Sequence, residues 1–292
     1  MSAGSYLERL AARTAATGTL LCLGLDPDLG MLPTGFPRDV VGVERFCALV
    51  LEAAAPYAAA VKPNLAFFEA FGAPGLEALE RLRAAIPDGL PVIADAKRGD
   101  IGSTAARQAV ALFDRLDADA VTVNPYLGGE AIAPLLERDD RFAYVLCRTS
   151  NPGAGEVQDL VVGDDRANGW PAEALHLRVA RLATGWGRGG TVGLVVGATA
   201  PEELAAVRGV APSLALLVPG IGAQGGDIGP VLEYGPATAP PGGGRPGGGL
   251  LVNISRGILA AASTGGTDAP EDPGDRLAEA ARDWAGRLPV LS

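Results

Sequence analysis

The sequence predicts a (β/α)8 barrel of the TIM-barrel class, formed as a single domain by residues 1–292. Three observations support this class: eight short apolar runs recur along the chain, helical patterns separate most of them, and polar residues gather where the runs end. The chain is 48% hydrophobic, and barrels of this class commonly need roughly 200–250 residues. A doubly wound open sheet is the alternative arrangement of such units.

The apolar runs indicate strands because their hydrophobic character is continuous and does not alternate, as strands covered on both faces require. They span residues 20–26, 58–64, 91–97, 120–126, 142–149, 191–198, 214–221 and 250–255.

Helical patterns lie between these runs and predict parallel βαβ units. A first helix, about residues 2–17, precedes the strands, and a helix ahead of eight units suits a closed barrel. The others cover residues 42–57, 77–86, 103–117, 129–138, 171–185, 201–211, 227–234 and 275–288.

Two stretches interrupt this alternation. Residues 150–171 form a long segment after the fifth strand, and loops of this length are usually functional or disordered. Residues 236–249 are rich in Gly and Pro, which predicts a flexible insertion leaving the far face of the barrel, away from catalysis.

Composition excludes several classes of partner. The net charge of −10 without a basic block argues against binding a nucleic-acid polymer. No window approaches the ~20 apolar residues of a membrane span. The first residues form an amphipathic pattern and no signal peptide, so we expect a cytoplasmic protein.

The cysteine and histidine content limits the chemistry. Cys22, Cys47 and Cys147 have no metal-binding spacing, and we expect free thiols in a reducing compartment. His176 is the only histidine, which argues against a multi-His metal site, and it lies in the helical pattern AEALHLRVARLA, where we expect a structural role. The sequence therefore also argues against a His-containing triad. Acid–base chemistry must then come from Asp, Glu, Lys, Tyr or Cys.

Polar residues follow the apolar runs at the end that carries function in this class, the carboxyl ends of the strands. They therefore predict one rim and one solvated cavity. These residues are Asp26, Lys62, Asp95, Lys97, Asp100, Asn124, Thr149 and Ser150.

Asp95 and Lys97 are two residues apart on a strand, which places both side chains on the same side. Neighbouring carboxylates keep an ammonium protonated. Such a lysine is a poor Schiff-base nucleophile and a good proton donor to a carbanion formed beside it.

The last two strand ends predict a phosphate site. The seventh strand runs into the glycine-rich PGIGAQGGD, whose backbone amides can surround an oxyanion, and the eighth is followed by Arg256 and Gly257. Loops after strands seven and eight are a frequent phosphate site in these barrels.

These motifs resemble the orotidine 5′-phosphate decarboxylase family, in its longer bacterial (type 2) form, over roughly residues 20–261. The resemblance is carried by GLDPD, VKPNLAFFEAFG, IADAKRGDIGSTA, TVNPYLGGEAI, CRTSNPGAGEVQDL, PGIGAQGGD and LVNISRGI. It implies a homodimer with shared active sites that converts orotidine 5′-monophosphate to uridine 5′-monophosphate and CO2, the last step of de novo pyrimidine synthesis. It implies no metal and no cofactor.

The resemblance also implies roles for individual residues. Asp26 and Lys62 bind the ribose hydroxyls, Asp95 lies beside the departing carboxylate, and Lys97 protonates C6. Asp100, with Thr104 nearby, reaches into the partner subunit's site. The remaining substrate-binding candidates are Ser150 for the pyrimidine, Gln224, Arg256 and the Gly257 amide for the phosphate, and Asn124 and Thr149 on the same rim.

Three alternatives stay open at this point. A magnesium-dependent sugar-phosphate decarboxylase or aldolase of the same barrel superfamily would share the D-x-K-x-x-D core. A non-catalytic barrel would bind the nucleotide without releasing CO2. A Schiff-base or phosphoribosyl-transferring barrel would require a lysine without two carboxylate neighbours.

Overall fold

The structure, a computed structural model, describes residues 4–222, 225–263 and 270–291. Eight strands overlap the eight apolar runs of the sequence. They are β1 (Leu21–Leu25), β2 (Ala60–Pro63), β3 (Ile93–Arg98), β4 (Ala120–Val123), β5 (Phe142–Arg148), β8 (Val192–Val196), β9 (Ala215–Val218) and β10 (Leu251–Ile254).

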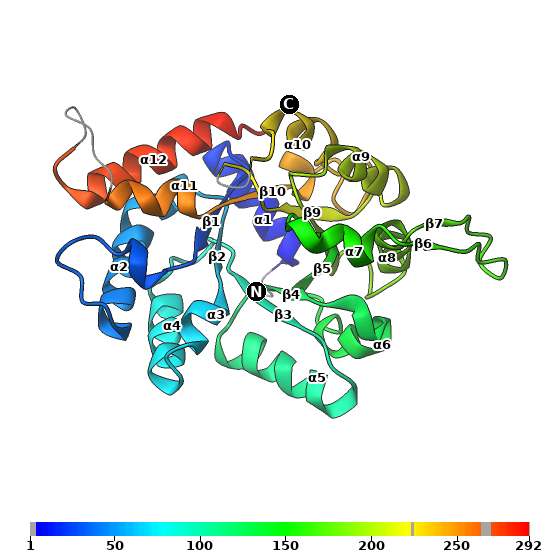
Figure 1. The fold of residues 1–292 in the computed structure, drawn as a ribbon, viewed down its shortest axis with the longest axis horizontal. Coiled ribbons are helices and arrows are strands. Elements are labelled where there is room, and N and C mark those ends of the chain that lie inside the picture. The colour runs from blue at the N-terminus through cyan, green and yellow to red at the C-terminus, as the bar shows by residue number, and fades with distance from the viewer. Residues whose placement is uncertain (1–3, 223–224, 264–269, 292) are drawn as a thin grey trace.

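The strands form one parallel sheet in the order β2-β1-β10-β9-β8-β5-β4-β3. Parallel bridges from Val61 to Val92 and from Asn64 to Asp95 join β2 to β3, so the sheet closes on itself. Helices surround the strands (Figure 1). The predicted (β/α)8 barrel is therefore confirmed, and the open-sheet alternative is wrong.

The long helices occupy the predicted positions, and several short ones were not predicted. The helix expected over residues 129–138 ends after one turn and continues as a 3-10 turn, because Pro134 lacks an N–H for a helical ladder. The helices are α1 (Tyr6–Thr17), α2 (Val40–Ala54), α3 (Leu65–Glu69), α4 (Ala73–Ala85), α5 (Gly102–Ala109), α6 (Gly129–Ile132), α7 (Gly155–Gln158), α8 (Leu175–Thr184), α9 (Pro201–Val210), α10 (Ile228–Tyr234), α11 (Arg256–Leu259) and α12 (Pro273–Arg287).

Helix α1 closes the amino-terminal end of the barrel. A capping box of Ser5 and Glu8 starts the helix. Tyr6 and Leu10 are buried in a cluster with residues at the starts of the strands, among them Phe142. The Tyr6 ring stacks on Phe142 with centroids 4.7 Å apart. This apolar plug leaves the carboxyl ends of the strands as the end available for a site.

The Gly/Pro segment 236–249 lies at the far face of the barrel, as predicted, but it is packed against its neighbours where a flexible insertion was expected. Its backbone is hydrogen-bonded to the loop before β9, with Thr238 and Ala239 donating to Pro212 and Gly242 donating to Ser213. It ends in a 3-10 turn, Pro246–Gly249, whose last three glycines are buried and which packs on α1. The expected flexible linker is thus a packed part of the barrel's amino-terminal end, because glycines without side chains fit closely beneath α1.

The long segment after β5 is structured. A 3-10 turn (Pro152–Ala154) and α7 lead into β6 (Val161–Val162) and β7 (Glu173–Ala174), which pair antiparallel and project from the barrel (Figure 1).

The three cysteines are free and buried. No helix in the described part of the chain is both long and apolar enough to span a membrane.

Candidate active site

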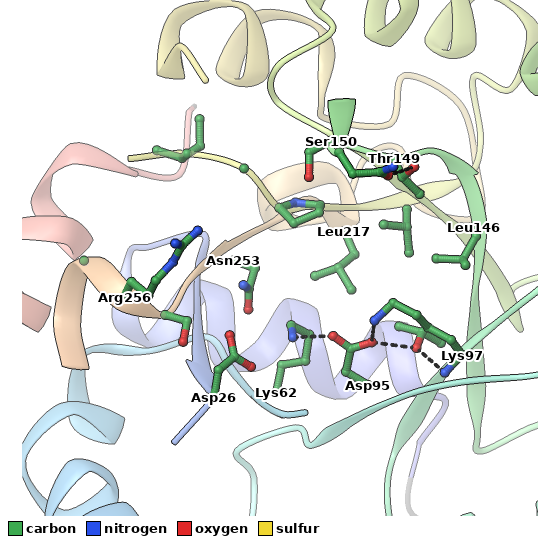
Figure 2. A pocket seen from close by; sticks show the side chains of 18 residues that line it. Asp26, Lys62, Asp95, Lys97, Leu146, Thr149, Ser150, Leu217, Asn253 and Arg256 are labelled. Atoms are coloured by element: carbon green, nitrogen blue, oxygen red, sulfur yellow. Dashed lines mark hydrogen bonds and ion pairs between the residues drawn. The ribbon is translucent and has the colours of Figure 1, made fainter. Parts of the chain in front are cut away.

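A cavity of about 310 Å³ opens at the carboxyl ends of the strands. All eight barrel strands, or the residues directly after them, contribute to its wall. Asp26, Lys62 and Asp95 lie along one side of the cavity, and Leu146 and Leu217 lie across from them (Figure 2). Val195 also lines it. Such a division suits a ligand with a flat, partly apolar ring and a charged or hydroxylated remainder.

Lys62, Asp95 and Lys97 form a continuous ion-paired array in this cavity. The two carboxylate oxygens of Asp95 are shared: Oδ2 lies 2.7 Å from Lys62 Nζ, and Oδ1 lies 2.5 Å from Lys97 Nζ. Lys62 is buried, whereas half of the Lys97 side chain is exposed to the cavity. The array thus presents one accessible ammonium (Figure 2).

The charges of the array stabilise one another. Burial opposes ionisation of Asp95, but the nearby charges of Lys62 and Lys97 outweigh it and hold the pKa of that carboxyl well below its ordinary value. Burial likewise opposes the charge of Lys62, but the carboxylates of Asp95 and Asp26 outweigh it and raise its pKa. Both groups are therefore ionised at neutral pH.

The backbone at Lys97 departs from regular strand geometry. Its φ is +48°, and the pairing of β3 with β4 shifts register between Ala94 and Arg98. Asp95 and Lys97 lie on the same side of β3 and both line the cavity, as the sequence predicted, although the backbone at Lys97 is not that of a regular strand. A non-glycine residue in this conformation costs about 1–3 kcal/mol and is typical of functional sites.

Thr122 of β4 holds this irregular turn. Its Oγ1 accepts hydrogen bonds from the backbone N–H groups of Ala96 and Lys97, at 3.1 and 3.0 Å, and donates to Asp95 Oδ1 at 3.0 Å. One hydroxyl therefore fixes both the carboxylate and the backbone that carries the accessible ammonium.

Arg256 and Gly257 lie at the start of α11 and line the same cavity. Arg256 makes no ion pair within the described ranges, and its guanidinium faces the cavity across from the lysines (Figure 2). Gly257 packs on Trp284, where an added Cβ would lie about 3.0 Å from the indole. The site therefore has a free cation at one side and a paired array at the other.

Thr149, Ser150 and Asn151 form the wall after β5. Ser150 lies against Gly197, where a Cβ would come within 2.7 Å of the serine Cβ, so only glycine permits this approach. Thr199 donates to the Ser150 carbonyl at 3.3 Å. The backbone at Ser150 is thus fixed, and its side chain faces the cavity (Figure 2).

Comparisons with known proteins identify the family. Residues 19–267 match the model of the orotidine 5′-phosphate decarboxylase / HUMPS family. The orotidine 5′-phosphate decarboxylase of Thermomicrobium roseum is 48% identical, covering 97% of this chain and 93% of that protein. The chain belongs to the orotidine 5′-phosphate decarboxylase family.

Solved structures agree with this assignment. The OMP decarboxylase of Leishmania donovani is 38% identical with a TM-score of 0.78, covering 97% of this chain and 96% of that one. The UMP synthase of the same organism is 39% identical with a TM-score of 0.80, and the match covers 97% of this chain and 56% of that longer chain. The family resemblance inferred from the sequence motifs is confirmed.

Most residues proposed from the decarboxylase motifs lie together. The cavity is lined by Asp26, Lys62, Asp95, Lys97, Thr149, Ser150, Arg256 and Gly257. Three do not line it: Asp100 accepts a hydrogen bond from Ile101 N at 2.7 Å, Thr104 is exposed on α5, and Asn124 caps the turn after β4. Gln224 lies outside the described residues.

Sequence reasoning missed Thr122, Asn151, Asn253 and Ser255, which all line this decarboxylase-family cavity. Asp26 Oδ1, Asn253 Oδ1 and Ser255 Oγ are buried oxygens without a hydrogen-bond partner among the described residues. A Cβ at Gly24 would lie 2.7 Å from Ser255 Cβ and 3.0 Å from Asn253 Oδ1, so this glycine makes room for both. Buried oxygens of this kind suit a hydroxyl-bearing ligand.

Proposed function

We propose that this chain decarboxylates orotidine 5′-monophosphate to uridine 5′-monophosphate and CO2, in the cytoplasm, with Lys97 as the proton donor. The observation that carries the proposal is the Lys62–Asp95–Lys97 array in one cavity with Arg256. The bond from C6 to the carboxylate carbon breaks, and its electron pair stays on C6. Lys97 Nζ then gives a proton to C6, and the lysine regains it from solvent.

The array suits this chemistry because the C6 carbanion lies in the ring plane and no adjacent carbonyl delocalises it. A fixed ammonium stabilises charge as it develops and needs no reorganisation at that moment. Asp95 holds Lys97 at 2.5 Å, and we assign it to the position beside the departing carboxylate. Lys62 helps to keep Asp95 ionised, so this carboxylate continues to orient the Lys97 ammonium while the carbanion forms.

The rest of the cavity accounts for binding. We assign the phosphate to Arg256, the Gly257 amide and Gln224, the ribose hydroxyls to Asp26 and Lys62, and the pyrimidine to Ser150 with Thr149. Phosphate binding energy, obtained away from C6, can then be used to orient the ring. Asn124 remains a candidate on the same rim.

We also propose a homodimer with shared sites, in which Asp100 and Thr104 complete the partner's cavity. Asp100 and Thr104 do not line their own cavity, and they lie next to Ile101, which is 59% exposed. An exposed isoleucine of this kind suits burial against a second copy.

The decisive experiment follows the fall in ultraviolet absorbance as purified protein acts on orotidine 5′-monophosphate with EDTA present. We expect turnover that EDTA does not change. Binding without turnover would favour a non-catalytic nucleotide barrel, and EDTA-sensitive action on a sugar phosphate would favour the magnesium-dependent alternative. Either result would overturn the proposal.

A further inference from the structure

We propose that Gln158, which lies outside the cavity, is a positioning residue that sets the hydrogen-bonding pattern of the pyrimidine-facing wall. This inference rests on the proposed function. Gln158 is the last residue of α7, and it acts on the wall through Thr149 and Asn151, which both line the cavity.

The Gln158 side chain is hydrogen-bonded to two atoms of Thr149, the backbone nitrogen and Oγ1. Its Oε1 accepts a hydrogen bond from the Thr149 backbone N–H at 2.8 Å, and its Nε2 donates to Thr149 Oγ1 at 2.8 Å. The backbone N–H can only donate, so it fixes which end of the glutamine amide faces it. The Nε2 group must then face the threonine hydroxyl.

This orientation gives the next contact a direction. Thr149 Oγ1 receives a hydrogen from Gln158 Nε2, and its own hydrogen has two acceptors in reach, Asn151 Oδ1 at 2.6 Å and Gln158 Oε1 at 3.2 Å. The shorter contact favours donation to Asn151. Asn151 lines the cavity, and with its oxygen engaged its amide N–H groups are left as the donors that it can offer. A pyrimidine dione has two carbonyl acceptors, so a donor on this wall matches it.

Helix α7 is held firmly enough to transmit this orientation. Asp159, directly after α7, makes a forked pair with Arg148 at 2.9 and 3.0 Å. The Gln158 carbonyl accepts a hydrogen bond from His176 Nδ1 at 2.9 Å, which also gives the only histidine a structural role. Arg148 donates to the Thr149 carbonyl at 2.8 Å. Side chain and backbone of Gln158 are both anchored.

Two variants distinguish the loss of the Gln158–Thr149 contacts from a change in the direction of the Thr149–Asn151 hydrogen bond. Gln158→Leu removes both contacts with Thr149. Gln158→Glu can still accept from the Thr149 N–H, but its second oxygen also accepts, so the threonine hydroxyl turns away from Asn151. Glu156→Gln is the matched control, because it lies on the same short helix, is exposed, and has no side-chain hydrogen bond or ion pair among the described residues.

The test compares two ligands by calorimetry: uridine 5′-monophosphate, and ribose 5-phosphate, which lacks the pyrimidine. Loss of one hydrogen bond at the ring corresponds to about tenfold in Kd. We expect Gln158→Leu and Gln158→Glu each to weaken the nucleotide about tenfold and to leave ribose 5-phosphate within about twofold. Glu156→Gln should change neither, and adding Asn151→Ala to Gln158→Leu should cause little further loss.

Equal weakening of the binding of both ligands, or unchanged binding of both, would overturn the positioning role. Wild-type affinity in Gln158→Glu would overturn the directional part of the proposal. These results are distinct from failure of the proposed function, which would appear as nucleotide binding by the wild type without release of CO2.

Discussion

Thr122 Oγ1 lies 3.0 Å from Asp95 Oδ1, the same carboxylate oxygen that accepts the Lys97 ammonium. The hydroxyl uses its single hydrogen on Asp95 and its lone pairs on two backbone N–H groups, so its hydrogen-bonding capacity is full. It therefore links the strained backbone at Lys97 to the charge that orients the lysine.

Replacing Thr122 by Val keeps the shape and removes the hydroxyl. Two backbone donors and one carboxylate oxygen then lose a partner, and we expect the free energy of unfolding to fall by about 2 kcal/mol. We also expect kcat to fall at least about tenfold, because Lys97 loses its fixed position. Urea unfolding and steady-state kinetics measure both, with Thr122→Ser as the control that retains the hydroxyl. Equal behaviour of the two variants would contradict this role.

Lys97→Ala removes the proposed proton donor and leaves the Lys62–Asp95 pair intact. We expect kcat to fall by at least about 10⁴-fold, since proton donation and electrostatic stabilisation are lost together. Circular dichroism should show an unchanged fold. Lys97→Arg is the control, because it keeps a positive charge but yields a proton much less readily. Near-normal turnover in the alanine variant would refute the assignment.

The lowered pKa of Asp95 predicts how stability depends on pH. A carboxyl with a depressed pKa in the folded state contributes stability above its unfolded pKa of about 3.9, and loses it as pH falls through the folded value. The difference in unfolding free energy between wild type and Asp95→Asn should therefore be constant from about pH 5 to neutrality and shrink in more acidic solution. Urea titrations at a series of pH values test this. A difference that grows on acidification would show the opposite linkage.

Mixed dimers test the proposed sharing of sites. Lys97→Ala and Asp100→Ala proteins should each be nearly inactive. After mixing and subunit exchange, one of the two sites in each hybrid dimer has both Lys97 and Asp100, so activity should partly return. Mass spectrometry or a fluorescence exchange assay confirms that hybrids form. Exchange without recovery would place Asp100 outside the partner's site.

The buried hydroxyls of Tyr6 and Tyr144, 3.0 Å apart, predict a non-additive pair at the closed end of the barrel. Tyr6→Phe leaves the Tyr144 hydroxyl buried without its partner, which should lower stability by about 1–3 kcal/mol. Changing both to Phe removes both polar groups and should cost less than the sum of the single changes. Thermal or urea unfolding of the wild type, the two single variants and the double variant gives the coupling energy between the two hydroxyls. Strict additivity would mean that the hydroxyls do not interact.

The strands and the positions of the charged residues could be predicted because they depend on local patterns. Continuous apolar runs require cover on both faces, and the residues that end them must meet at one rim. That reasoning placed Asp26, Lys62, Asp95, Lys97 and Arg256 around one cavity, as the structure has them.

Residues whose role depends on packing between strands could not be predicted. Thr122 is an ordinary β-branched residue within an apolar run, and only the register of β3 and β4, with its irregularity, brings it to Asp95. Asn253 needs the empty space at Gly24 on the neighbouring strand. The Gly/Pro composition of residues 236–249 suggests flexibility, but small residues also allow close packing, and contacts with α1 decide between the two.

The apolar plug of α1 has a consequence for how ligands enter and leave the cavity. Tyr6 and Leu10 fill the amino-terminal end of the barrel, so in the described part of the chain the nucleotide enters the cavity from the carboxyl ends of the strands. The product must then leave by the opening through which the substrate enters, and the two cannot occupy the cavity at the same time. Under the proposed function, uridine 5′-monophosphate should act as a purely competitive inhibitor, and turnover should slow as it accumulates.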